Sequence, residues 1–149
     1  MLIQDLKILL VRDLKKLRSE ITQYGSESAI WRTDKAIPNS AGNLCLHLVG
    51  NLNTFIGAVL GNTGYVRKRD LEFSLKDIPA AELVSKIDET VHVVESTLNQ
   101  LEEHKLGESY PIVVFDKEMT TGHFLIHLAM HLSYHLGQVN YHRRLLDNQ

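Results

Sequence analysis

The stretch LIQDLKILLVRDLKKLRSEITQY, residues 2–24, decides the fold class of this chain. Its apolar side chains recur in steps of three and four, which is the spacing of one face of an α-helix. Gly25 follows directly and is a plausible helix end. The sequence therefore predicts a long amphipathic helix, whose apolar face consists of Ile3, Leu6, Leu10, Leu14, Leu17, Ile21 and Tyr24.

Three further helices are predicted: over residues 40–60, from Pro79 to an end at Gly107 and Pro111, and over residues 120–146. The segment 40–60 is apolar on every side, as expected of a helix that is buried on more than one face. The segment that starts at Pro79 carries an apolar stripe in steps of three and four, from Val84 to Leu101. Each segment opens with a residue that favours a helix start: Ser40, Pro79, and Thr120 or Thr121.

The stretches between these helices are predicted to be loops. Residues 26–39 are mostly polar, and residues 61–70 contain two glycines that break the helical pattern. The run PIVVF, residues 111–115, resembles a strand but has no second strand pattern to pair with, so it is interpreted as an extended connection. The sequence thus predicts an all-α fold, a four-helix bundle in one domain over residues 1–149, with connections long enough for a crossover.

Composition limits the classes of function. The 16 basic and 18 acidic residues are balanced, so nucleic acid is not an expected partner. The amino-terminal segment has no apolar run longer than residues 8–11, too short for a signal peptide or a membrane span. The lone cysteine, Cys45, excludes an intrachain disulfide, which agrees with a reducing compartment. We therefore expect a cytoplasmic protein that does not bind a membrane.

Histidine is the residue type that stands out, with eight in the chain and five between residues 123 and 142. Histidines four positions apart on a helix can bind one metal ion. On a helical wheel, His131 and His135 lie near the centre of a face that also carries Phe124 and Leu128. The alternative is that these histidines hydrogen-bond to carbonyl groups in the core. Spacing alone leaves both interpretations open.

The second predicted helix offers a third histidine. His47 shares a face with Asn51 and Thr54, whereas Cys45 points about 160° away on the wheel and is a poor candidate for the same ion. A bundle site needs a further ligand from a facing helix, and His47 is placed to provide it.

Three local patterns resemble a known family. The stretch HLSYHLGQVNYHRRLL, residues 131–146, resembles the HxxxHxGQ signature of the DinB/YfiT-like superfamily of metalloenzymes. The stretch NLCLHLVGNLNTFIG, residues 43–57, is similar to the NLxxHLxGN segment of an uncharacterised branch of it. The charged stretch RKRDLEF, residues 67–73, resembles the segment that follows in that branch. The resemblance covers nearly the whole chain, with the helices in the expected order.

The resemblance implies an up-down-down-up bundle that holds a divalent metal, commonly zinc or nickel. The family's ligands fall on His47, His131 and His135, and three protein ligands leave a coordination position open, as in catalytic sites. Near relatives can carry another polar residue or histidine where this chain has Thr54. Helix geometry also projects four polar side chains near the ion: Asn51, Thr54, Tyr134 and Gln138. Each of them either hydrogen-bonds to a histidine ring and holds it in place or is simply a packed polar residue.

The resemblance also implies a homodimer and a small-molecule substrate. The apolar second helix is one candidate for the dimer face, and another side of the fourth helix is a second candidate. The alternative is that both are covered within the monomer. The second candidate face carries Leu125, Leu132 and Leu136.

Characterised relatives include S-transferases that use a low-molecular-weight thiol, and this activity is the first hypothesis. Under this hypothesis Cys45 is not the nucleophile, because the thiol comes from solution. A metal-dependent hydrolase is the alternative enzyme, but it needs a general base and no carboxylate lies on either histidine face; Glu118, before the fourth helix, is the nearest candidate. Two non-enzymatic hypotheses remain: a metal-binding stress-response protein and a metal-free helical scaffold. No catalytic residue is assigned.

Overall fold

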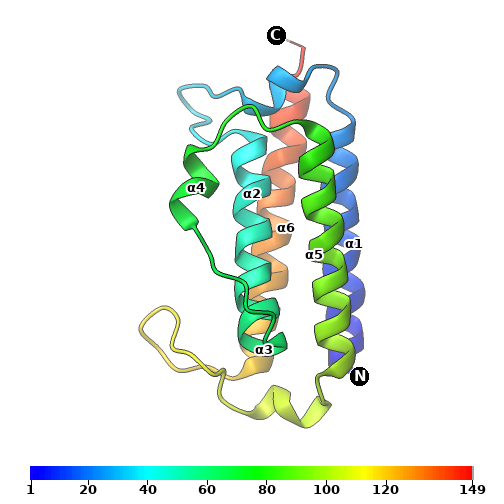
Figure 1. The fold of residues 1–149 in the computed structure, drawn as a ribbon, viewed down its shortest axis with the longest axis vertical. Coiled ribbons are helices and arrows are strands. Elements are labelled where there is room, and N and C mark those ends of the chain that lie inside the picture. The colour runs from blue at the N-terminus through cyan, green and yellow to red at the C-terminus, as the bar shows by residue number, and fades with distance from the viewer. Residues whose placement is uncertain (149) are drawn as a thin grey trace.

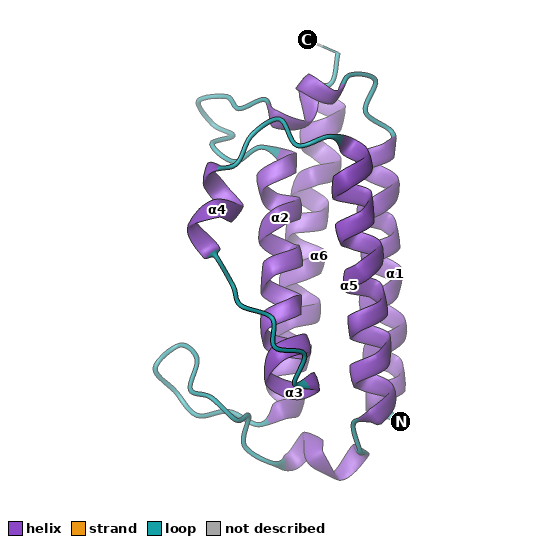
Figure 2. Cartoon of the chain, viewed as in Figure 1, coloured by secondary structure: helices purple, strands orange, loops and turns teal. Residues whose placement is uncertain are grey.

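The computed structural model describes residues 1–148 and is helical, with no strand in that part of the chain (Figure 2). Four long helical segments lie side by side along the long axis (Figure 1). They are α1 (Leu2–Thr22), α2 (Ala41–Leu52) with its continuations η2 (Asn53–Ala58) and α3 (Val59–Gly61), α5 (Ala80–Gln100) and α6 (Thr121–Leu146). Three short helices lie between them: η1 (Glu27–Trp31), α4 (Arg69–Ser74) and η3 (Glu103–Gly107).

The helix starts follow the predicted caps. The Ser40 hydroxyl accepts a hydrogen bond from the Asn43 amide, and the Thr120 hydroxyl accepts one from the His123 amide, each at 3.1 Å. These bonds satisfy amide donors that have no partner inside the first turn. The predictions that helices begin after Ser40 and Thr120 are therefore confirmed, and α5 likewise begins directly after Pro79. The predicted end of this helix at Gly107 and Pro111 is wrong, because α5 ends at Gln100 and a separate short helix, η3, follows.

The core lies where α1, α2, α5 and α6 meet. The predicted apolar face of α1 is buried from Ile3 to Ile21, and all 12 residues of α2 are buried. On α6, Leu125 and Leu132 are fully covered within the chain, and Leu136 is half-buried. The structure therefore favours the alternative for α2, Leu125 and Leu132, which other helices of the same chain cover, whereas Leu136 stays partly exposed.

The buried face of α5 differs from the predicted stripe. Burial centres on Leu83, Ile87 and Thr90, while Val84 and Val91 are half-buried at its margin. Thr90 fits this position because its hydroxyl donates to the Lys86 carbonyl at 2.7 Å. A hydrogen-bonded threonine can be buried at low cost. A prediction that counts only apolar residues leaves Thr90 out and therefore misplaces the centre of the buried face of α5.

Two segments predicted as loops contain short helices. Residues 26–39 include η1, which buries Ala29, Ile30 and Trp31, and α4 begins at Arg69, at the end of the predicted break over residues 61–70. The Trp31 ring lies directly over Gly42, where a Cβ atom would come within 2.6 Å of it. Such short helices depend on tertiary packing, since their few hydrogen bonds do not stabilise them alone.

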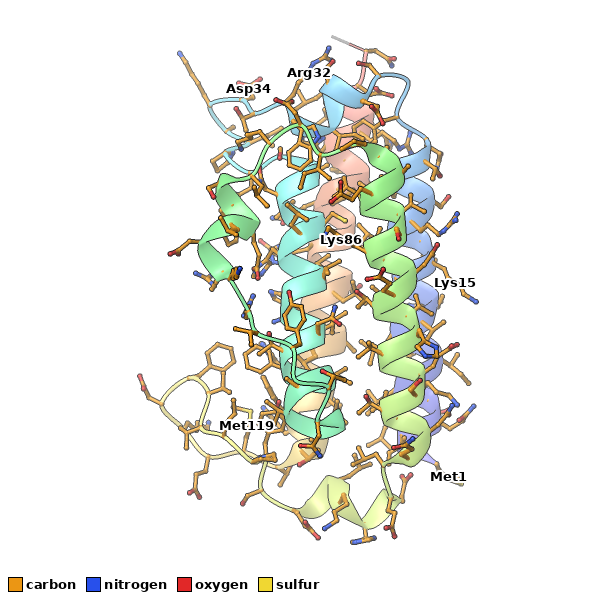
Figure 3. The ribbon with its side chains drawn as sticks, in the orientation of Figure 1. Met1, Lys15, Arg32, Asp34, Lys86 and Met119 are labelled. Atoms are coloured by element: carbon orange, nitrogen blue, oxygen red, sulfur yellow. The ribbon has the colours of Figure 1, made fainter. Side chains whose placement is uncertain are left out.

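The run PIVVF is not part of a strand in the described chain, as predicted. It leads into a tight turn closed by a bridge between Val114 and Lys117, with positive φ angles at Phe115 and Asp116. The turn belongs to the loop at the lower end of Figure 1, and Met119 marks that loop in Figure 3. Arg32 and Asp34 mark the opposite end of the molecule, where α6 ends (Figures 1 and 3).

One helical stretch, Ala41–Gly61, is long and apolar enough to cross a membrane. However, 61% of its most apolar window is buried inside the protein, and the core helix of a soluble protein passes the same test. Within the described residues this stretch is the single candidate. Its burial against α5 and α6 explains its apolar composition without a membrane.

Candidate metal centre

Three histidine rings meet between α2 and α6. His47 comes from α2, and His131 and His135 lie one turn apart on α6. The Nε2 atom of His131 is 3.2 Å from Nε2 of His47 and 3.1 Å from Nε2 of His135. One ligand nitrogen from each ring lies within 4.8 Å of the others, so the three could hold a metal ion.

Burial favours the neutral form of the two α6 imidazoles, which is the form that binds metals. It lowers the pKa of His131 to about 4, and the neighbouring His135 and His47 contribute to this shift. Burial also lowers the pKa of His135, and this outweighs the opposite effect of its hydrogen bond to Gln138. These two rings are half-buried, while His47 is only 8% exposed.

Two of the rings are fixed from behind through their other nitrogen. His47 Nδ1 lies 3.1 Å from Glu72 Oε1, and His135 Nδ1 lies 2.6 Å from Gln138 Oε1. Both oxygens are acceptors, so each Nδ1 carries the proton and each Nε2 has a free lone pair. Arg67 Nη2 also approaches His47 Nδ1, at a longer 3.4 Å, but its main partner is Glu72.

The geometry of the three Nε2 atoms fits a metal ion. A proton on His131 Nε2 can serve one of its two close neighbours, but the other contact then has no donor proton, whereas one metal ion satisfies all three nitrogens. Nitrogens bound to one tetrahedral zinc at about 2.0–2.1 Å lie roughly 3.3 Å apart, close to the spacing seen here. The buried Nδ1 of His131 has no hydrogen-bond partner within the described chain, so no acceptor there holds this ring in one tautomer.

Glu72 also belongs to the site, although the sequence did not predict it. It is only 6% exposed and comes from α4, outside both histidine helices. Arg67 donates to both its oxygens, from Nε to Oε2 at 2.8 Å and from Nη2 to Oε1 at 3.0 Å. Burial by itself raises the pKa of Glu72, but the hydrogen bonds from His47 and Arg67 outweigh it, and the pKa is lowered.

Gly50 makes room for this carboxylate. A Cβ atom at Gly50 would lie 2.7 Å from Glu72 Cδ and would also clash with Oε2. Neither histidine helix carries a carboxylate on its histidine face, and it is α4 that brings one to the cluster. Glu118, the candidate general base before α6, is exposed and, among the described residues, does not belong to the group that could hold a metal.

Two features of the sequence lie at the contact between Glu72 and α2, but neither identifies Glu72 as a partner of His47. One is the charged stretch 67–73, and the other is the glycine at position 50, three residues after His47. Neither feature has a spacing rule that connects residue 72 to residue 47. The pairing of Glu72 with His47 could therefore not be predicted.

The four polar residues predicted near the ion have different positions. Gln138 holds the His135 ring through its side-chain oxygen. Tyr134 is 66% exposed, with its ring 5.3 Å from that of His135. The side-chain oxygens of Asn51 and Thr54 are closed off from solvent and have no hydrogen-bond partner within the described chain. The structure therefore joins Gln138 directly to a histidine, but not Asn51 or Thr54.

A groove of about 670 Å³ reaches Gln138, the residue that holds the His135 ring. Tyr134 and Gln138 line it, together with residues from the segment 36–39 and the last turns of α6. Gln138 therefore touches the groove on one side and His135 on the other. His47, His131 and His135 do not line the groove, so its connection to the cluster runs through Gln138.

The other histidines on the inner side of α6 do not join the cluster. The half-buried His127 ring stacks on that of His131, with a centroid distance of 6.2 Å. His142 is buried. It accepts a hydrogen bond from the Tyr24 hydroxyl at 2.7 Å and donates one to the Arg32 carbonyl at 2.8 Å. These two hydrogen bonds indicate that His142 holds α6 to the segments that carry Tyr24 and Arg32.

Cys45 is expected to be unreactive in the folded protein. It is fully buried, and burial raises the pKa of its thiol to about 12. Native protein should react with an aromatic disulfide reagent about 10³-fold more slowly than urea-unfolded protein, because reaction requires opening of the fold. The variant Ser133→Cys, at an exposed position, is the matched control and should react at once. Rapid labelling of Cys45 itself would contradict this placement.

Comparison with known families gives one match. A family model described as "Protein of unknown function (DUF1572)" matches residues 3–149. No curated protein matches the chain.

Proposed function

The chain belongs to the DUF1572 family, and we propose that it is a divalent-metal-dependent enzyme of the DinB-like type, with His47, His131 and His135 as ligands. The observation that carries this proposal is the position of His131 Nε2, which lies 3.1–3.2 Å from the Nε2 atoms of both other rings. In Figure 1, α1 and α6 run upward while α2 and α5 run downward. This order supports an up-down-down-up bundle.

The proposed reaction is transfer to a low-molecular-weight thiol from solution. When bound, a divalent ion such as zinc or nickel supplies Lewis acidity at an open position, which lowers the pKa of a thiol that reaches it. The sulfur then forms a bond to an electrophilic carbon, the leaving group departs with its electron pair, and the thiol proton goes to solvent. Cys45 is too deeply buried to act as this thiol.

Side chains around the three histidines orient the ligand rings and leave a way in for a small molecule. Glu72 and Gln138 fix the tautomers of His47 and His135, so that both Nε2 lone pairs are free toward His131. Arg67 balances the charge of Glu72. The half-buried rings of His131 and His135 leave one side open to a small molecule.

A metal-dependent hydrolase is less well supported. It needs a carboxylate free to accept a proton from water. Both oxygens of Glu72 are already occupied by Arg67 and His47. Glu72 is therefore better suited to holding a histidine than to acting as a general base.

Two further expectations are kept as proposals. A homodimer is supported by exposed apolar side chains on the outer side of α6, among them Ile126, Met130 and Tyr134. A cytoplasmic location is supported by the single buried cysteine.

The test uses cobalt as a spectroscopic substitute for zinc. Protein loaded with one equivalent of Co²⁺ should show a new near-ultraviolet thiolate-to-cobalt band when a low-molecular-weight thiol is added, and should then consume the thiol with an alkylating electrophile. Cobalt binding without a thiol band would overturn the transferase and leave a passive metal binder. Failure to bind cobalt, zinc or nickel would overturn the metalloenzyme altogether.

A further inference from the structure

The segment 62–79, which we call the strap, crosses the outside of α2 on its way from α3 to α5 (Figure 1). Polar contacts hold it to α2. Asn43 Nδ2 donates to the carbonyls of Glu72 and Leu75, each at 2.9 Å. Lys76 Nζ donates to Asn43 Oδ1 at 2.7 Å. The strap is thus attached at one end by a buried asparagine.

The strap also reaches the histidine cluster. The Glu72 carboxylate lies in the space left by Gly50 and contacts His47 Nδ1. The Phe73 ring lies 5.1 Å from the His47 ring. Arg67, from the same segment, completes the buried ion pair. One metal ligand is therefore held by a chain segment that contributes no ligand itself.

We propose that the strap closes on the metal centre, with Glu72 as the positioning residue for His47, and that metal binding and strap docking strengthen each other. The inference rests on the metal site of the proposed function, but not on the thiol reaction. An ion on Nε2 makes the Nδ1–H of an imidazole a stronger donor, so its bond to a buried carboxylate is strengthened. Linkage makes the effect reciprocal.

The first test measures hydrogen exchange of the strap with and without zinc. Amides of residues 65–76 should exchange more slowly in the zinc-loaded protein, by about 5–150-fold. Peptides from α1, which contributes no residue to the cluster, are the internal control. Unchanged exchange in the strap of zinc-loaded protein would overturn the coupling.

The second test measures metal affinity in two independent variants. Glu72→Gln removes the charge, and Gly50→Ala displaces the carboxylate while leaving Glu72 in the sequence. Each should lower zinc affinity about 10–100-fold and shift the visible ligand-field spectrum of bound Co²⁺. Their matched controls are Asp70→Asn, an exposed charge on α4, and Gly137→Ala, whose Cβ would meet nothing within 4 Å.

The outcomes separate the two proposals. If wild-type protein binds zinc but both variants match their controls in affinity and spectrum, the strap inference fails and the metal site stands. If wild-type protein binds no zinc, the proposed function fails, and the inference fails with it. Two variants are used because one of them could fail to fold.

Discussion

Replacing His131 with alanine is expected to abolish stoichiometric metal binding. Its Nε2 atom is the one within 3.2 Å of both other Nε2 atoms, so its removal leaves only one ligand on each of two helices. Loss of a residue that only supports a ligand costs about 10–100-fold in affinity, so loss of the ligand itself should cost more than about 100-fold. Metal content by plasma mass spectrometry and a zinc competition titration measure this.

The matched control is His127→Ala on the same helix. His127 stacks on His131 but lies outside the cluster, so this variant should keep the wild-type metal content. The metal-free His131→Ala protein should remain folded, since the change removes a buried nitrogen that has no partner within the described chain. Equal metal content in wild-type protein and His131→Ala would refute the assignment.

Replacing Phe124 with alanine should have the largest effect on stability. Phe124 is 1% exposed, and its ring contacts those of Phe55 and Tyr110, at centroid distances of 5.1 and 4.5 Å. It therefore joins α6 to the π-helical turn η2 and to the loop before α6. Removing a buried phenylalanine costs about 3–5 kcal/mol, because a cavity remains. Urea unfolding of the metal-free protein measures the loss.

Phe115→Ala is the control from the same aromatic cluster. Phe115 is 66% exposed, and its ring centroid lies 6.4 Å from that of Phe124. Its removal should cost less than about 1 kcal/mol. If the two variants lose equal stability, Phe124 is not the centre of this packing.

The helices and two of the proposed ligands could be predicted because the rules that govern them are local. Ser40 and Thr120 cap the turns that follow them, and apolar steps of three and four define the buried face of α1. The spacing of His131 and His135 places both rings on one side of α6 in any helix. His47 was selected by its helix face, and the family resemblance indicated the same residue.

Contacts between distant segments could not be predicted in this way. No spacing rule connects Glu72 to His47, and the space beside Gly50 is filled only after α4 has packed on α2. His142 is buried because Tyr24 and Arg32 reach it from other parts of the chain.

The sequence by itself determined the helices and the histidine spacing, because each depends on neighbours within a few residues. Tertiary structure decided how far α6 is buried, that Glu72 contacts a histidine, and how the His47 ring is oriented. These three features depend on which surfaces of distant segments meet, and no local pattern encodes that.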